Sequence, residues 1–86
     1  MKIYVGRVCY IEHVPGWSTL WDGIYYIKSD TVKVDYSNYY NDQLILVIGT
    51  DTQGKFRDIK FGLNKIRKIV PISKEEELIW RIEYGV

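Results

Sequence analysis

Between residues 2 and 72 the apolar side chains come in short runs, and each run stops at a sequence that favours a turn. The runs are rich in valine, isoleucine and tyrosine, which fit the pleated surface of a β-sheet. They lack the sustained 3.6-residue repeat of an amphipathic helix. This pattern predicts a β-protein. The expected strands cover residues 2–12, 24–28, 31–36, 44–48, 55–61 and 66–72.

Details within these runs specify the expected sheet further. In residues 2–12 the apolar side chains change from one face of the expected strand to the other near Gly6. This change indicates a β-bulge, because glycine tolerates the backbone conformation of a bulge. Residues 44–48 are apolar at both odd and even positions, so both faces of this segment are apolar as a strand. They therefore predict a central strand that is covered on both faces. Asp51 and Gly54 have the spacing of a type I turn, so the strands before and after this turn are expected to pair.

The last part of the chain predicts a helix over residues 74–84. Ser73 and Glu76 match a capping box, in which serine caps the first turn and glutamate follows three residues later. Gly85 is expected to end the helix. The helix is expected to carry one apolar stripe, formed by Leu78, Ile79 and Ile82 and widened by Trp80 and Tyr84.

Together these elements predict a mainly β fold. We expect a small antiparallel barrel of five to six strands with one C-terminal helix, of SH3-like type, with an OB-like barrel as the alternative. The long first connection, the meander and a 3₁₀-like turn at 62–64 favour the SH3-like arrangement. A chain of 86 residues can build only one core, so residues 1–86 form a single domain, with the barrel in 1–72 and the helix in 73–85.

No combination of residues predicts a catalytic or metal site. Cys9 and His13 are the only cysteine and histidine, and four residues of strand would separate them by about 13 Å, beyond hydrogen-bond reach. His13 is expected to lie at the surface or to pack within a loop. The glycines form no phosphate-binding pattern. We therefore expect a non-enzymatic protein with no metal and no cofactor.

The cysteine content and the length of the apolar runs also predict the cellular location of the protein. A single cysteine cannot form an intramolecular disulfide, so the fold depends on packing alone. The N-terminal residues do not resemble a signal peptide, and the longest apolar run, 44–48, is far shorter than a membrane span. A cytoplasmic protein without membrane contact is the simplest interpretation.

Aromatic residues in two loops, 13–23 and 36–42, favour protein binding as the function. Tyrosine and tryptophan dominate protein interfaces because they bury a large area at low entropic cost. The chain would then act as an adaptor or as an inhibitor that occludes its partner. For Trp17 and Trp21 the alternative is that they plug one end of the barrel. The candidate protein-binding residues are Trp17, Trp21, Tyr25, Tyr36, Tyr39 and Tyr40.

A cluster of basic residues predicts a second function, nucleic-acid binding through a basic hairpin at 55–68. Residues 55–70 hold six basic side chains and one acidic side chain, whereas 1–54 and 71–86 are each net negative. The alternative is that these cations keep an exposed sheet soluble, and the overall charge of +1 favours that alternative. The candidate phosphate contacts are Lys55, Arg57, Lys60, Lys65, Arg67 and Lys68.

The amount of apolar surface predicts a third function, that of a homo-oligomeric structural component. The strand at 44–48 and the helix with Trp80 and Tyr84 offer more apolar surface than one small barrel can bury. A homodimer is therefore favoured over a monomer.

Overall fold

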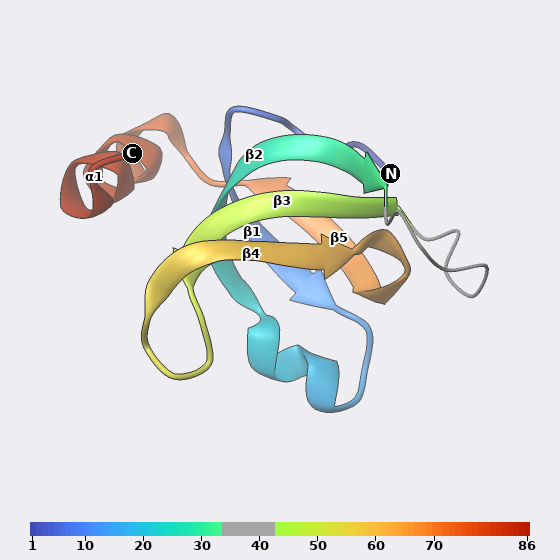
Figure 1. Cartoon of the computed structure of the whole chain (residues 1–86). Coiled ribbons are helices and arrows are strands. Elements are labelled where there is room, and N and C mark those ends of the chain that lie inside the picture. The colour runs from blue at the N-terminus through green and yellow to red at the C-terminus, as the bar shows by residue number, and fades with distance from the viewer. Residues whose placement is uncertain (34–42) are drawn as a thin grey trace.

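Five antiparallel strands form one sheet in the computed structural model, which describes residues 1–33 and 43–86 (Figure 1). The strands lie in the order β4-β3-β2-β1-β5. The predicted mainly β fold with one C-terminal helix is thus confirmed. The elements are β1 (Val8–His13), the 3₁₀ helix η1 (Trp17–Trp21), β2 (Gly23–Lys33), β3 (Gln43–Thr50), β4 (Phe56–Gly62), the 3₁₀ helix η2 (Leu63–Lys65), β5 (Ile66–Pro71) and α1 (Lys74–Tyr84).

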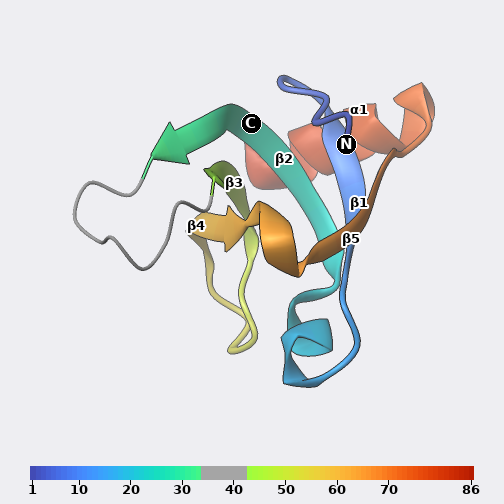
Figure 2. The ribbon, with the colours of Figure 1, turned by 90° about the vertical axis from the view of Figure 1, so that its right-hand side faces the viewer.

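The sheet is strongly curved but open (Figure 2). Its two edge strands are β4 and β5, and no pairing joins them within the described parts of the chain. The expected basic hairpin at 55–68 is therefore wrong, because β4 pairs with β3 and β5 pairs with β1. Between them η2 carries the chain from one edge of the sheet to the other, so the basic residues are divided between two edges.

The start of the chain differs from the predicted strand over 2–12. Only Val8–His13 is a strand, and the backbone turns before it, where the Arg7 N–H donates to the Tyr4 carbonyl at 3.1 Å. Gly6 adopts a φ of 83° in this turn, a left-handed conformation that glycine reaches without strain. The point near Gly6 where the apolar side chains change faces is thus a turn rather than a bulge.

The strands expected at 24–28 and 31–36 are joined in one strand, β2, which runs without interruption through Ser29 and Asp30. Its pairing with β3 shifts register between Ile27 and Ser29 and again between Ser29 and Val32. Ser29 and Asp30, which separate the two expected strands, therefore lie where the pairing of a continuous strand is irregular. Residues 34–36 of the expected strand lie outside the described residues.

The core lies on the concave face of the sheet. Five of its side chains are fully buried, namely Cys9, Ile11, Ile27, Ile45 and Val47. Val8 is also fully buried, but it lies on the other face of β1, because successive side chains of a strand alternate between faces. Tyr25 and Phe61 belong to the same core and make an edge-to-face contact, with ring centroids 5.0 Å apart. The other members of the core are Ile59, Ile66 and Ile69. In β3 alternate residues are buried and half-buried, so the expectation of a strand covered on both faces holds for only one face.

The predicted helix at 74–84 is confirmed at both ends. The Glu76 N–H donates to Ser73 Oγ at 3.2 Å, and this hydroxyl donates in turn to Glu76 Oε1 at 3.1 Å. Gly85 ends the helix in the left-handed conformation, with a φ of 72°. Within residues 1–33 and 43–86, no helix is both long and apolar enough to cross a bilayer.

Candidate binding surfaces

Helix α1 presents two different faces, and the aliphatic face points away from the sheet. Leu78, Ile79 and Ile82 are 60%, 65% and 74% exposed. We call these three residues the outer stripe. The opposite face, which holds Trp80 and Tyr84, contacts the sheet. The sequence predicted one continuous stripe of five apolar residues, and the structure divides it between solvent and protein.

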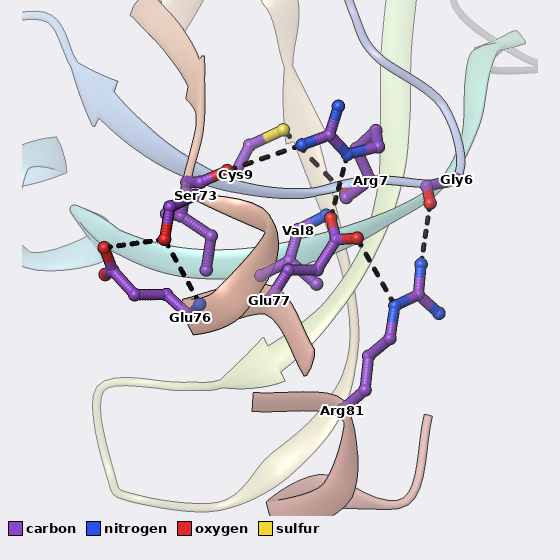
Figure 3. Close-up of polar contacts among 9 residues, drawn as sticks. Gly6, Arg7, Val8, Cys9, Ser73, Glu76, Glu77 and Arg81 are labelled. Atoms are coloured by element: carbon purple, nitrogen blue, oxygen red, sulfur yellow. Dashed lines mark hydrogen bonds and ion pairs between the residues drawn. The ribbon is translucent and has the colours of Figure 1, made fainter. Parts of the chain in front are cut away.

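Ionic and aromatic contacts hold the inner face of α1. Glu77 accepts hydrogen bonds from Arg7 Nε at 3.0 Å and from the Val8 N–H at 2.6 Å (Figure 3). Arg81 donates to the Gly6 carbonyl at 2.8 Å and lies over the ring of Tyr26. Because charged and aromatic groups hold the helix to the sheet, its aliphatic residues are left to face solvent.

A second apolar surface lies on the convex face of the sheet. Ile24, Tyr10 and Val70 are cross-strand neighbours on β2, β1 and β5, and each is about two-fifths exposed. Between this face and α1 is a groove of about 530 Å³. Its apolar lining includes Tyr10, Leu20, Ile24, Trp80 and Tyr84. The groove thus joins the convex face to the inner side of α1.

A pocket of about 480 Å³ lies where β4 faces the end of β1 and η1. We call it the His13 pocket. Its apolar walls include Trp21, Ile59 and Phe61, and three cations, Arg57, Lys60 and Lys65, also line it. The Val14 N–H donates to the Lys65 carbonyl at 2.9 Å, so a backbone contact ties the end of β1 to η2 beside the pocket.

His13 is buried beside this pocket, with 4% of its surface exposed, so its expected place at the surface or in a loop is wrong. Its Nδ1 lies 3.0 Å from Asp22 Oδ1, which also accepts the His13 backbone N–H at 2.6 Å. An ionised carboxylate only accepts hydrogen bonds, so Nδ1 is the donor in this pair. Nε2 is buried and has no hydrogen-bond partner among the residues that the structure describes.

The aromatic candidates for protein binding have different positions. Tyr25 is 3% exposed, and its hydroxyl donates to the Trp21 carbonyl at 2.7 Å, so it is a core residue rather than part of an exposed surface. Burial raises the pKa of Tyr25 to about 12, and the charges of Asp22 and Asp51 add to this effect.

Trp21 is half-buried and packs against the core, with its ring 6.0 Å from that of Phe61. Packing of this kind is what the alternative role of Trp21, a plug at one end of the expected barrel, would require. Trp17 belongs to η1, and the position of its side chain is outside what the structure describes. The other three candidates, Tyr36, Tyr39 and Tyr40, lie in the undescribed segment 34–42.

All six basic candidates are exposed, but the sheet separates them. Arg57, Lys60 and Lys65 meet at the His13 pocket, where Arg57 Nε also pairs with Asp51 at 2.7 Å. Lys55 precedes β4. On β5, Lys68 is exposed and Arg67 lies 3.8 Å from a carboxylate oxygen of Glu12.

Two acidic residues have roles that the sequence did not reveal. Asp22 orients His13, and Glu77 connects α1 to the start of β1. The sequence did contain a signal for the burial of His13. Cys9, Ile11 and His13 occupy alternate positions on one face of the strand, and the first two are apolar. The alternation of side chains along the strand therefore places the imidazole on the same concave face as these two residues. No comparable signal existed for Glu77, whose partners lie about seventy residues away in the chain.

The thiol and the acidic groups form no metal-binding cluster in the described part of the chain. No group of three or more His, Cys, Asp or Glu side chains there could hold a metal ion. Cys9 is fully buried, and burial raises the pKa of its thiol to about 11, although the charge of Arg7 partly opposes this shift. Comparisons with known proteins found no match, since no family model, curated protein or solved structure matches this chain.

Proposed function

We propose that this chain is a small protein-binding module and that the outer stripe of α1 is the centre of its contact surface. The observation that carries the proposal is the exposure of Leu78, Ile79 and Ile82 on one face of a short helix. An apolar helix face of this kind suits a hydrophobic groove, in which residues spaced three and four apart act as anchors. The module would act as an adaptor or as an inhibitor that occludes its partner.

The energetics support this surface. Burying one leucine or isoleucine side chain contributes about 1.5–3 kcal/mol, and the three side chains of the outer stripe remain largely in water. The inner face of α1 is already held by Glu77, Arg81 and Tyr84, so a partner can cover the outer stripe without displacing the helix. Binding would therefore require little reorganisation of the chain.

The arrangement of strands supports an SH3-like variant over an OB-like one. A first strand, a connection with η1, three strands in succession, and the 3₁₀ turn η2 before a last strand that pairs with the first are the expected SH3-like elements. In this proposal the aromatic residues Trp17, Tyr36, Tyr39 and Tyr40 remain additional candidate contacts.

A second copy of the chain is one partner that the outer stripe can take. This is the homo-oligomeric function that the sequence also suggested, and it uses the same residues. A measured mass in solution separates the two cases, because one chain has a mass of 10.2 kDa. A larger mass that returns to one chain when the stripe is made polar identifies the second copy as the partner.

The proposal is tested by a variant with Leu78→Gln, Ile79→Gln and Ile82→Gln. Glutamine has good helix propensity, so α1 should persist. The matched control carries Glu75→Gln and Glu83→Gln, which are also exposed on α1. Proteins from a host extract that bind the wild type and the control, but not the stripe variant, would support the proposal. So would loss of a dimer mass in the stripe variant alone.

The opposite result would overturn it. If the stripe variant keeps its helical circular dichroism, binds the same proteins as wild type and has the same solution mass, then the outer stripe is not the contact surface.

A further inference from the structure

We infer that the His13 pocket binds a planar aromatic ring that carries a phosphate group, the chemistry of a nucleotide. The ligand can be a free nucleotide or one unit of a single strand. This inference is independent of the outer stripe of α1, because none of the residues that line the pocket belongs to α1.

The walls of the pocket suit a flat ring. The pocket volume of about 480 Å³ lies within the range of about 300–1,000 Å³ that is typical of small-molecule sites. Trp21 and Phe61 meet nearly at right angles, at 75°, so the two rings form a corner rather than a stack. A nucleobase placed on Trp21 would add the stacking contact that this corner lacks.

The cations supply the site for phosphate. Lys60 and Lys65 line the pocket and make no ion pair with any residue in 1–33 or 43–86. The guanidinium of Arg57 is partly neutralised by Asp51, so the two ammonium groups contribute most of the unpaired positive charge. Phosphate oxygens would accept charge-assisted hydrogen bonds from these groups.

His13 adds a third and more selective feature. In the tautomer whose Nδ1–H donates to Asp22, the free lone pair of the ring is on Nε2, which is buried and unpartnered among the described residues. An amino or ring N–H of a base can donate to this nitrogen. Neighbouring side chains shield Nε2 from solvent, so this contact forms only as they shift on binding.

The cations outside the pocket allow a free nucleotide to be distinguished from a nucleic-acid strand as the ligand. Arg67 and Lys68 lie on β5, the opposite edge strand, and do not line the pocket. A strand that continues beyond the pocket would contact more phosphate-binding side chains than a mononucleotide. Its affinity should therefore fall more steeply with salt.

The test is a titration followed by the backbone and His13 ring resonances in NMR spectra. The probes are adenosine monophosphate, adenosine, inorganic phosphate and a short single-stranded oligoadenylate. We expect saturable shifts at Trp21, Phe61 and His13 with the monophosphate, and weaker binding of adenosine and of phosphate alone. The variant Lys60→Gln, Lys65→Gln should bind the monophosphate at least about tenfold more weakly, because two charge-assisted hydrogen bonds are lost.

A matched control, Lys2→Gln with Lys74→Gln, removes two exposed cations that do not line the pocket. It should bind the monophosphate like the wild type. If Arg67→Gln with Lys68→Gln weakens only the oligoadenylate, the ligand is a strand. If it changes neither affinity and the monophosphate binds as tightly as the oligomer, the ligand is a free nucleotide.

Three results would overturn the inference. The first is the absence of saturable shifts with both the monophosphate and the oligoadenylate. The second is unchanged affinity in the Lys60→Gln, Lys65→Gln variant. The third is equal affinity for inorganic phosphate and for the monophosphate, because the ring would then contribute nothing.

Discussion

Glu77 Oε1 accepts a hydrogen bond of 2.6 Å from the backbone N–H of Val8, and so joins the C-terminal helix to the first strand. Val8 is fully buried, and the same oxygen also accepts from Arg7 Nε at 3.0 Å. One carboxylate therefore satisfies a backbone donor at the start of β1 and a guanidinium beside it. This contact sets which face of α1 meets the sheet, and with it which face remains open to a partner.

Glu77 should make the stability of the chain depend on pH. Burial by itself would raise the pKa of this carboxyl, but the Val8 N–H, the Arg7 guanidinium and the charge of Arg81 together lower it below its ordinary value of 4.5. A group with a lowered folded-state pKa stabilises the fold above its ordinary pKa, and the contribution is lost as pH falls through the lowered value.

We therefore expect Glu77→Gln to reduce the free energy of unfolding by about 1–3 kcal/mol near neutral pH. The difference from wild type should shrink below about pH 4. Chemical denaturation at several pH values measures it, with the exposed Glu75→Gln as control. A difference that stays constant down to about pH 2 would contradict the assigned role.

The rings of Phe56 and Tyr84 should stabilise the docking of α1 as a pair. They stack with centroids 4.7 Å apart and an interplanar angle of 5°. A double-mutant cycle with Phe56→Leu and Tyr84→Leu should give a coupling energy of about 0.5–1.5 kcal/mol. The same cycle with Ile82→Ala in place of Tyr84→Leu should give almost none, since Ile82 faces solvent. Equal coupling in both cycles would refute this docking geometry.

Gly49 should not tolerate a larger side chain. A Cβ at this position would collide with the ring of Tyr25, whose hydroxyl is anchored on the Trp21 carbonyl. We expect Gly49→Ala to reduce the free energy of unfolding by about 1–3 kcal/mol, because the ring cannot move without losing that hydrogen bond. In a Tyr25→Leu background the same substitution should cost clearly less. An equal cost in both backgrounds would mean that the ring is not the obstacle.

Cys9 should resist thiol reagents while the chain is folded. Its side chain is fully buried and burial raises its pKa to about 11, so little thiolate forms near about pH 8. Mass spectrometry should show slow alkylation by iodoacetamide in buffer and rapid alkylation in denaturant. Rapid alkylation of the folded chain would indicate that β1 opens readily or that the thiol is accessible.

Features that depend on nearby residues were predictable from the sequence. The helix over 74–84, its Ser73 cap and its Gly85 end were predicted with the observed bounds. The turn between β3 and β4 was predicted from Asp51 and Gly54, and in it the Gly54 N–H donates to the Asp51 carbonyl at 3.1 Å. Each of these contacts spans only a few residues, so the local sequence contains both partners.

The candidate binding surfaces were less predictable, because they depend on contacts between distant segments. Composition could not show that Tyr25 belongs to the core, since its packing against Phe61 depends on how distant strands are arranged. Nor could it show that β4 and β5 lie on opposite edges, which brings Lys60 and Lys65 to the His13 pocket and leaves Arg67 and Lys68 outside it.

By itself the sequence determined that the chain forms short antiparallel strands followed by one helix, because strand propensity, turns and caps act over a few residues. Only the tertiary structure decided which side of each element faces solvent. In α1 that choice followed from ion pairs and ring stacking with residues far along the chain, which placed Glu77 and Tyr84 inward and the aliphatic stripe outward. Long-range partners determine orientation, and no local pattern contains them.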